Sequence, residues 1–258
     1  MSSQNGSTGL PAIARKVFLT GTVLVLGGAA LVGCVGRGPT HTETKQLSFH
    51  HRIDRIEFDL DSGNITLTRG EQGQVGIGRT LTWTDDRPVF KEEWQGNVLR
   101  ITSKCDGRHC SADYKVQLPS SVQVDASTEA GVISTQAVQG DQQLKTDSGD
   151  IRVTDAAGRL SASVKSGNIT ADGLASASAS ATSQAGNLSM GFVRAPAQVT
   201  ARAQSGNVNV KVPHTGQQYR VQADTDAGQK SVKVAQSSTG QGAITAHSDA
   251  GNIDIDYA

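Results

Sequence analysis

A glycine-centred phrase recurs along this chain at a nearly constant interval. It reads SGNITL from Ser62 and then AGVIST, SGDIRV, SGNITA, AGNLSM, SGNVNV, AGQKSV and AGNIDI from Ala130 onward. From Ala130 the successive copies lie 18, 18, 19, 20, 22 and 23 residues apart. Such a period predicts stacked structural units, because a short repeat buries its apolar face only against its neighbours.

Each copy of the phrase predicts a strand, a sharp corner and a second strand. Before the glycine the inward candidates fall on even positions (Leu144, Thr146 and Ser148), and after it they fall on odd positions (Ile151 and Val153). A strand alternates with a period of two, so this change of parity requires an extra residue at the corner. Glycine adopts positive φ freely, and Asn or Asp tolerates the left-handed region. The predicted corner residues are Gly63, Asn64, Gly149, Asp150, Gly167, Asn168, Gly186, Asn187, Gly206, Asn207, Gly251 and Asn252.

The predicted fold class is all-β, a single-domain β-solenoid of stacked strand–corner–strand coils. In such a stack, Asn168, Asn187 and Asn207 come close enough to form a ladder of side chains. A β-sandwich is the structural alternative, since it also consists of many short strands separated by turns. A sandwich, however, gives no reason to reuse one corner phrase so many times.

The composition predicts a thin core and two different ends. Only ten of 258 residues are aromatic, and hydrophobic residues make up 36%, so small side chains must fill the interior. Both tryptophans, Trp83 and Trp94, lie in the less regular segment 46–118 and are expected to cap one open end of the stack, with a binding platform as the alternative. The C-terminal NIDIDY is expected to close the far end, where Asp254 and Asp256 would discourage edge-to-edge pairing.

The N-terminal residues predict export and a lipid anchor. Arg15 and Lys16 precede a run of fourteen uncharged residues (17–30), which is short for a membrane-spanning helix. The run closes on LVGC, which resembles a bacterial lipobox, in which lipid is attached to the cysteine, here Cys34. An ordinary signal anchor that happens to contain a cysteine is the alternative.

This interpretation divides the chain into four segments. Residues 1–33 are a lipoprotein signal peptide, 34–45 the lipidated Cys34 with a flexible tether, 46–118 an N-terminal β region capping the solenoid, and 119–258 the repetitive solenoid. The expected location is the bacterial cell envelope, outside the cytoplasm. By resemblance to lipoproteins, the absence of Asp at position 35 implies sorting to the outer membrane in a cell that has two membranes.

The two remaining cysteines, Cys105 and Cys110, predict a disulfide. They form an even pair in a chain expected outside the cytoplasm, and the four residues between them can make a hairpin turn. A metal site using Cys105, His109 and Cys110 matches known zinc spacings poorly, and free thiols are the third alternative. No metal is therefore expected at this position.

Together these features resemble the bacterial putative-adhesin domain family of unknown function, a relative of the "head GIN" adhesin-like domains. The resemblance rests on the serial SGN-I phrases, on YKVQLP (114–119) leading into the repeats and on the early IEFDLDSGNITL, and it covers about 46–258. It implies a right-handed or mixed β-solenoid on the envelope surface with no assigned activity, and it supplies no catalytic residues. The chain departs from the pattern at Val132, in place of Asn, and at Lys230, in place of an apolar residue.

Charge and motifs argue against several classes of function. The chain has 24 basic and 24 acidic residues and no basic patch typical of nucleic-acid binding. Its glycines fit neither the dinucleotide fingerprint nor the phosphate loop, so no cofactor is expected. Two acidic segments, DTDAG (224–228) and SDAGNIDID (248–256), are weak calcium candidates that fit no known calcium loop. Turn chemistry alone explains most of these aspartates.

Three functions follow as expectations. The first is a non-enzymatic envelope lipoprotein, anchored to the membrane by its lipid, that acts as an adhesin or surface-binding module for an envelope glycan or a surface protein. Its repetitive polar face suits a repeating ligand, because linked weak contacts gain from effective concentration. The second is a structural or signalling accessory of an envelope-stress membrane protein. The third is a polysaccharide-active enzyme, which needs clustered carboxylates at a defined separation.

Overall fold

The structure is a computed structural model that describes residues 39–107 and 109–258. Within these residues the chain forms 21 strands and no helix. The signal segment 1–33 and Cys34 lie outside the described residues. The first strand begins at His41, inside the segment expected as a tether.

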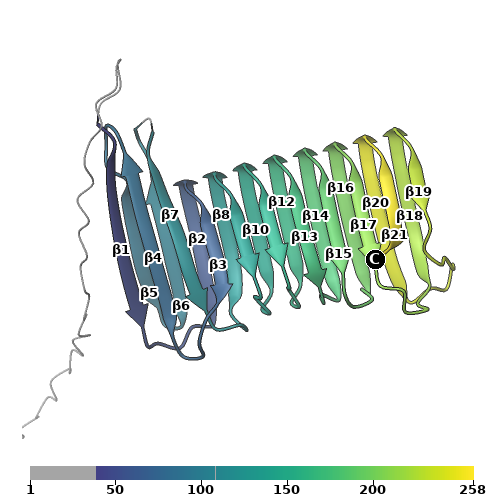
Figure 1. Cartoon of the computed structure of the whole chain (residues 1–258), viewed down its shortest axis with the longest axis horizontal. Helices are drawn as coiled ribbons and strands as arrows, with labels where there is room; N and C mark the ends of the chain where they lie inside the picture. The colour runs from purple at the N-terminus through teal and green to yellow at the C-terminus, as the bar shows by residue number, and fades with distance from the viewer. Residues whose placement is uncertain (1–38, 108) are drawn as a thin grey trace, which may run out of the picture.

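The strands form two sheets that face one another along the length of the molecule (Figure 1). Sheet A contains eleven strands in the order β1 (His41–Phe49), β4 (Val75–Trp83), β7 (Ser111–Leu118), β3 (Ile65–Arg69), β9 (Ile133–Gln136), β11 (Ile151–Thr154), β13 (Ile169–Leu174), β15 (Leu188–Phe192), β17 (Val208–Val212), β21 (Ile253–Tyr257) and β19 (Lys230–Val232). Sheet B contains ten strands in the order β18 (Tyr219–Ala227), β20 (Gly242–Ala250), β16 (Gln198–Ser205), β14 (Ser178–Ala185), β12 (Leu160–Ser166), β10 (Gln142–Ser148), β8 (Gln123–Ala130), β2 (Arg55–Ser62), β6 (Val98–Lys104) and β5 (Val89–Gln95).

Each repeat contributes one strand to sheet B and the next strand to sheet A, and we call this pair a coil. Neighbouring coils pair in parallel and in register. Leu144 on β10 lies between Ala126 on β8 and Ala162 on β12, and Ile151 on β11 pairs with Ile133 and Ile169. The 18-residue step read from the sequence is therefore the step from one coil to the next. A sandwich of hairpins would have paired these strands antiparallel.

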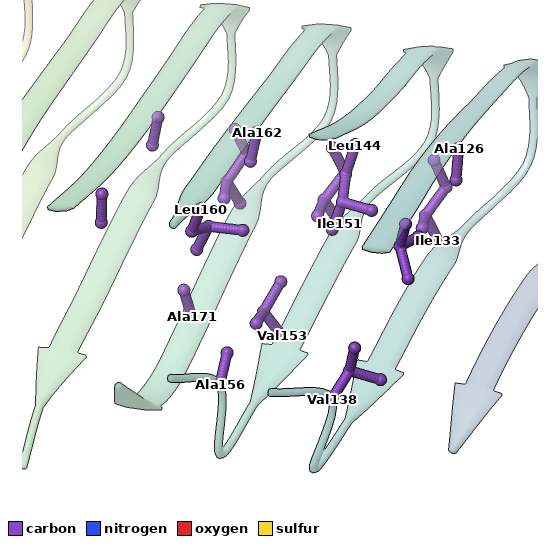
Figure 2. Packing of buried hydrophobic residues seen from close by; sticks show 14 of the residues in the cluster. Ala126, Ile133, Val138, Leu144, Ile151, Val153, Ala156, Leu160, Ala162 and Ala171 are labelled. Carbon is purple, nitrogen blue, oxygen red and sulfur yellow. The ribbon is translucent and has the colours of Figure 1, made fainter. Parts of the chain in front are cut away.

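The core is a single apolar layer between the two sheets. Figure 2 shows aliphatic side chains from both sheets meeting there, among them Ala126, Leu144, Ile151 and Leu160, all of which are buried. The predicted alternation holds up to Thr146, but Ser148, expected to face inward, is exposed because the chain has already begun to turn. Aliphatic residues thus fill most of the interior of the coils.

The N-terminal end of the stack is built differently from the coils. β4 runs antiparallel to both β1 and β7, and β5 runs antiparallel to β6, whereas the repeats pair only in parallel. Trp83 on β4 and Trp94 on β5 are partly buried and pack against the core. Both tryptophans therefore help to cover the end of the core.

The C-terminal end differs from the expectation. The last coil in sequence, β20 and β21, lies between β16–β17 on one side and β18–β19 on the other. The prediction that NIDIDY closes the far end is wrong, since Asp254 on β21 has Asn209 and Ser231 as register partners on its two sides. The outermost coil is β18–β19, and a chain segment after it covers only its start, through hydrogen bonds between Tyr219 and residues Ala235 and Ser237.

Candidate functional site

The predicted corner glycines lie where the chain crosses from sheet B to sheet A. All of them have φ between +142° and +155°, a region that residues with a side chain rarely adopt. A Cβ added at any of them would lie 2.0–2.2 Å from a carbonyl oxygen of the neighbouring coil or, for Gly63, of β7. The glycines with both properties are Gly63, Gly131, Gly149, Gly167, Gly186, Gly206 and Gly251.

An Asn or Asp after the corner glycine links one coil to the next, and Val132 is the exception. The side-chain oxygen accepts a hydrogen bond from the backbone N–H of the equivalent residue in the adjacent coil, at 2.8–2.9 Å. Asn64 makes the same bond to the N–H of Val132. The predicted ladder of Asn168, Asn187 and Asn207 is present. In spatial order its members are Asp150, Asn168, Asn187, Asn207, Asn252 and the backbone of Gln229.

A second ladder at the corners was not anticipated from the sequence. A hydroxyl three residues before a corner glycine donates to the carbonyl oxygen of the adjacent coil's corner glycine, as the buried Thr146 does to Gly131 at 3.0 Å. The signal in the sequence is Ser or Thr at that spacing, with Leu60, Val164 and Ala203 as the exceptions. The donors are Thr128, Thr146, Ser183, Thr225 and Ser248. The corner residues are thus occupied in holding coils together.

The structure joins Cys105 and Cys110 by a disulfide, with their Cα atoms 5.7 Å apart. The bridge closes the connection between β6 in sheet B and β7 in sheet A. Asp61 holds the same connection from the other side, because its carboxylate accepts hydrogen bonds from the Lys104 ammonium and the Cys105 backbone N–H. These contacts give the disulfide an architectural role.

A groove on the outer face of sheet A is the strongest candidate for a binding site. It has a volume of about 620 Å³ and crosses β1, β4, β7 and β3 at the N-terminal end of the stack. A second hollow of about 380 Å³ shares Gln74, Gly76 and Gln117 with it and extends it toward Arg69 and Glu71. The two hollows form one continuous trough over four strands.

Strand register arranges the trough in two rows of polar residues. One row consists of Gln46, Gly78, Lys115 and Thr66, which pair across successive strands. The second row consists of Ser48, Gly76, Gln117 and Thr68. In both rows the β4 position is a glycine, so no β4 side chain rises from the middle of the trough.

The two glycines of β4 are essential to this shape. A Cβ on Gly78 would lie 2.9 Å from the side-chain amide of Gln46, and a Cβ on Gly76 would lie 3.3 Å from the side-chain oxygen of Gln117. Both glutamines therefore reach over the strand where an ordinary residue would stand. The sequence signal for these positions is the pair of outward glycines in VGIGRT (75–80), which is unusual for a strand interior.

Beneath the trough, the inner face of β4 carries a buried charge. Arg79 is 3% exposed and its guanidinium contacts the Glu92 carboxylate at 2.5 Å while lying over the Phe90 ring. Burial, with a smaller contribution from the Glu92 charge, raises the pKa of the nearby Tyr114 hydroxyl. The pair fixes β4 against β5 of the opposite sheet and so supports the floor of the trough.

The trough is polar, and its two rows carry little charge. The rows present amides and hydroxyls together with a single ammonium, that of Lys115, while Arg69 and Glu71 lie where the second hollow extends the trough. Amides and hydroxyls both donate and accept hydrogen bonds, which suits a ligand rich in hydroxyl groups. In residues 39–107 and 109–258, no helix is long and apolar enough to cross a membrane.

Similarity to solved structures extends over most of the chain. A putative adhesin from Bacteroides fragilis NCTC 9343 is 14% identical, with 84% of this chain and 97% of that chain covered and a TM-score of 0.44. A putative cell adhesion protein from Clostridium sporogenes ATCC 15579 is 9% identical, with 84% and 100% covered and a TM-score of 0.33. A putative adhesin from Parabacteroides merdae ATCC 43184 is 14% identical, with 86% and 98% covered and a TM-score of 0.27.

The sequence also identifies the family to which the chain belongs. No curated protein matches the chain. Residues 50–257, which include every copy of the repeat, match the family described as Toastrack DUF4097. The chain therefore belongs to the Toastrack DUF4097 family.

Proposed function

We propose that this chain is a non-enzymatic β-solenoid lipoprotein that binds an extended, hydroxyl-rich polymer of the cell envelope, a glycan, along the outer face of sheet A. The observation that carries the proposal is the pair of polar rows that begin in the glycine-floored trough. We propose further that Cys34 is the lipid-bearing residue and that the protein acts on the envelope surface as an adhesin-like module.

The rows continue well beyond the trough. Thr66 is followed in register by Ser134, Arg152, Thr170, Ser189 and Asn209 on successive strands of sheet A. Neighbouring strands are about 4.8 Å apart, so a polymer laid across them meets a polar side chain at that regular interval. Each contact is weak, but contacts along one chain add through effective concentration.

The ionisable residues that line the trough support binding of a glycan without its cleavage. Hydrolysis of a glycosidic bond by the common mechanism uses two carboxyl groups that flank the bond. Among the described residues that line the trough, Glu71 is the single carboxylate. Lys115 offers an ammonium donor, which favours a glycan that carries acidic groups.

The test is a pull-down of purified envelope polysaccharides with the full chain, followed by assays for depletion of polymer and for new reducing ends. Depletion without new reducing ends is the expected result. New reducing ends would overturn the non-enzymatic assignment, and the absence of depletion would overturn the glycan as ligand.

Two matched variants locate the binding surface. Gly78→Thr places a branched side chain on the floor of the trough, and we expect it to reduce binding at least tenfold. Ser161→Thr also adds a methyl branch at an exposed position, but on the outer face of β12 in sheet B, away from the proposed binding face. Binding that falls equally in both variants, or in neither, contradicts the trough as the site.

A further inference from the structure

Three metal-ligating side chains meet on the outer face of sheet B near its far end. Ligand atoms of Asp226, His247 and Asp249 all lie within 4.8 Å of one another, and His247 Nε2 is 2.9 Å from Asp249 Oδ1. Asp226 comes from β18, and the other two residues come from β20. Asp226 and Asp249 are exposed, and His247 is half-buried.

The pairing of the last two coils brings this cluster together. β18 and β20 are parallel neighbours in which Thr225 pairs with Ser248 and Ala227 pairs with Ala250, so Asp226 lies beside Asp249. In the sequence Asp226 belongs to the acidic segment 224–228 and Asp249 to the segment 248–256, and His247 directly precedes the second segment. Neither segment alone supplies all three ligands, and Asp226 joins His247 and Asp249 only through the pairing of β18 with β20.

We propose that Asp226, His247 and Asp249 bind one first-row divalent cation of the Zn²⁺ type. Two carboxylates and one imidazole are a borderline ligand set, which suits Zn²⁺, whereas Ca²⁺ and Mg²⁺ prefer oxygen ligands alone. Three protein ligands leave the fourth position of a tetrahedral ion to water. The cation also neutralises two carboxylates that the sheet holds side by side.

Binding of the ion by these three residues requires movement of side chains only. Zinc ligands lie about 2.0–2.2 Å from the ion, which places them roughly 3.4 Å from one another in a tetrahedral site. Asp226 is exposed and can rotate inward, while the 2.9 Å contact between His247 and Asp249 opens slightly to admit the ion. The backbone positions are fixed by the parallel pairing of β18 and β20.

One positive and one negative residue flank the His247 imidazole on the neighbouring strands. The register partners of His247 are Arg202 on β16 and Asp224 on β18. Arg202 opposes a bound cation and Asp224 favours it, so the two carboxylate ligands supply the net attraction. The ion would link the outermost coil to its neighbour, because one ligand belongs to β18 and two belong to β20.

Isothermal titration of the full chain with Zn²⁺ tests the site. The protein should be purified in detergent without a polyhistidine tag and stripped with a chelator. We expect one ion per chain, with affinity reduced at least tenfold by His247→Ala and by Asp226→Asn. The matched control is His50→Ala, which removes an exposed imidazole at the opposite end of the stack and should leave the affinity unchanged.

Hydrogen exchange gives a second readout that does not depend on heat of binding. Zn²⁺ should slow amide exchange in β18, because a ligand that binds only the native state stabilises it. The effect should disappear in His247→Ala. Binding that survives His247→Ala, Zn²⁺ binding no tighter than that of Ca²⁺, or unchanged exchange in β18 would each overturn the proposal.

Discussion

The Cβ position of Gly167 lies 2.0 Å from the carbonyl oxygen of Gly149, and Gly167 itself has a φ of +142°. Two separate restrictions therefore act on this residue. One is the backbone angle, which disfavours any side chain, and the other is the contact with the adjacent coil. The two restrictions can be separated because Gly96 also has positive φ (+60°) but has nothing within 4 Å of its Cβ position.

We expect Gly167→Ala to reduce the free energy of unfolding by about 3 kcal/mol or more, since strain and a backbone clash add. Gly96→Ala should reduce it by only about 1 kcal/mol, which is the cost of the left-handed conformation alone. Urea denaturation measures both values. Equal losses in the two variants would show that the coils separate easily and that stacking at the corner is not tight.

The asparagine ladder predicts which side chains the position after the corner glycine tolerates. Asn187 accepts a hydrogen bond from the backbone N–H of Asn207 at 2.9 Å. Asn187→Asp keeps this acceptor, as Asp150 does naturally, and should change stability by less than about 0.5 kcal/mol. Asn187→Val removes the acceptor and should lower stability by about 1 kcal/mol. A valine variant as stable as the aspartate variant would mean that water replaces the ladder.

The buried pair of Arg79 and Glu92 predicts strong coupling between the two residues. Arg79→Leu leaves the Glu92 carboxylate buried without its partner, and loss of one member of such a pair costs about 3–5 kcal/mol. The double variant Arg79→Leu/Glu92→Leu should recover most of this loss, because neither charge then remains. A double-mutant cycle measures the coupling, and additive effects would contradict it.

Much of this architecture could be predicted from the sequence, because the phrase repeats. A period of 18 to 23 residues fixes the coil length, and the parity change across Gly149 fixes the corner. The order of the last two coils could not be predicted. The order decides whether β18 or β20 pairs with β16, and the local sequence of either strand is compatible with both orders.

The trough and the proposed metal cluster also depend on contacts that the sequence alone does not show. Gly76 and Gly78 are visible in the sequence, but their function as a floor depends on Gln46 and Gln117 arriving from two other strands. Likewise, Asp226 and His247 are 21 residues apart and meet only because β18 pairs with β20. Local patterns predict elements, whereas these sites arise from contacts between elements.

The inverted order also predicts the effect of a truncation. β18 and β19 pair with β20 and β21 in the two sheets, and Lys230 stands where the other coils have Ile, Leu or Val. Deleting residues 242–258 should therefore release two coils instead of one. Hydrogen exchange should show loss of protection over 219–232 while 198–212 stays protected. Retained protection over 219–232 would mean that this coil docks directly on β16 and β17.

The proposed lipid anchor is tested by cell fractionation. If Cys34 carries the lipid, Cys34→Ala should move the protein from the membrane fraction to the soluble fraction and abolish labelling with a radioactive fatty acid, since acyl chains would then supply the membrane affinity. The control is the double variant Cys105→Ser/Cys110→Ser, which removes the other two cysteines and should keep the label. A Cys34→Ala protein that remains with the membrane would refute the anchor.

The position of β20 and β21 has a consequence for how the molecule is made. A chain that emerges from the N-terminus forward can add its coils one at a time as far as Val212. The next coil, β18–β19, cannot take its final place until β20 and β21, which follow it in the chain, have paired with β16 and β17. The outermost coil of the stack is therefore held by residues made after it, and its docking reports that β20 and β21 are already in place.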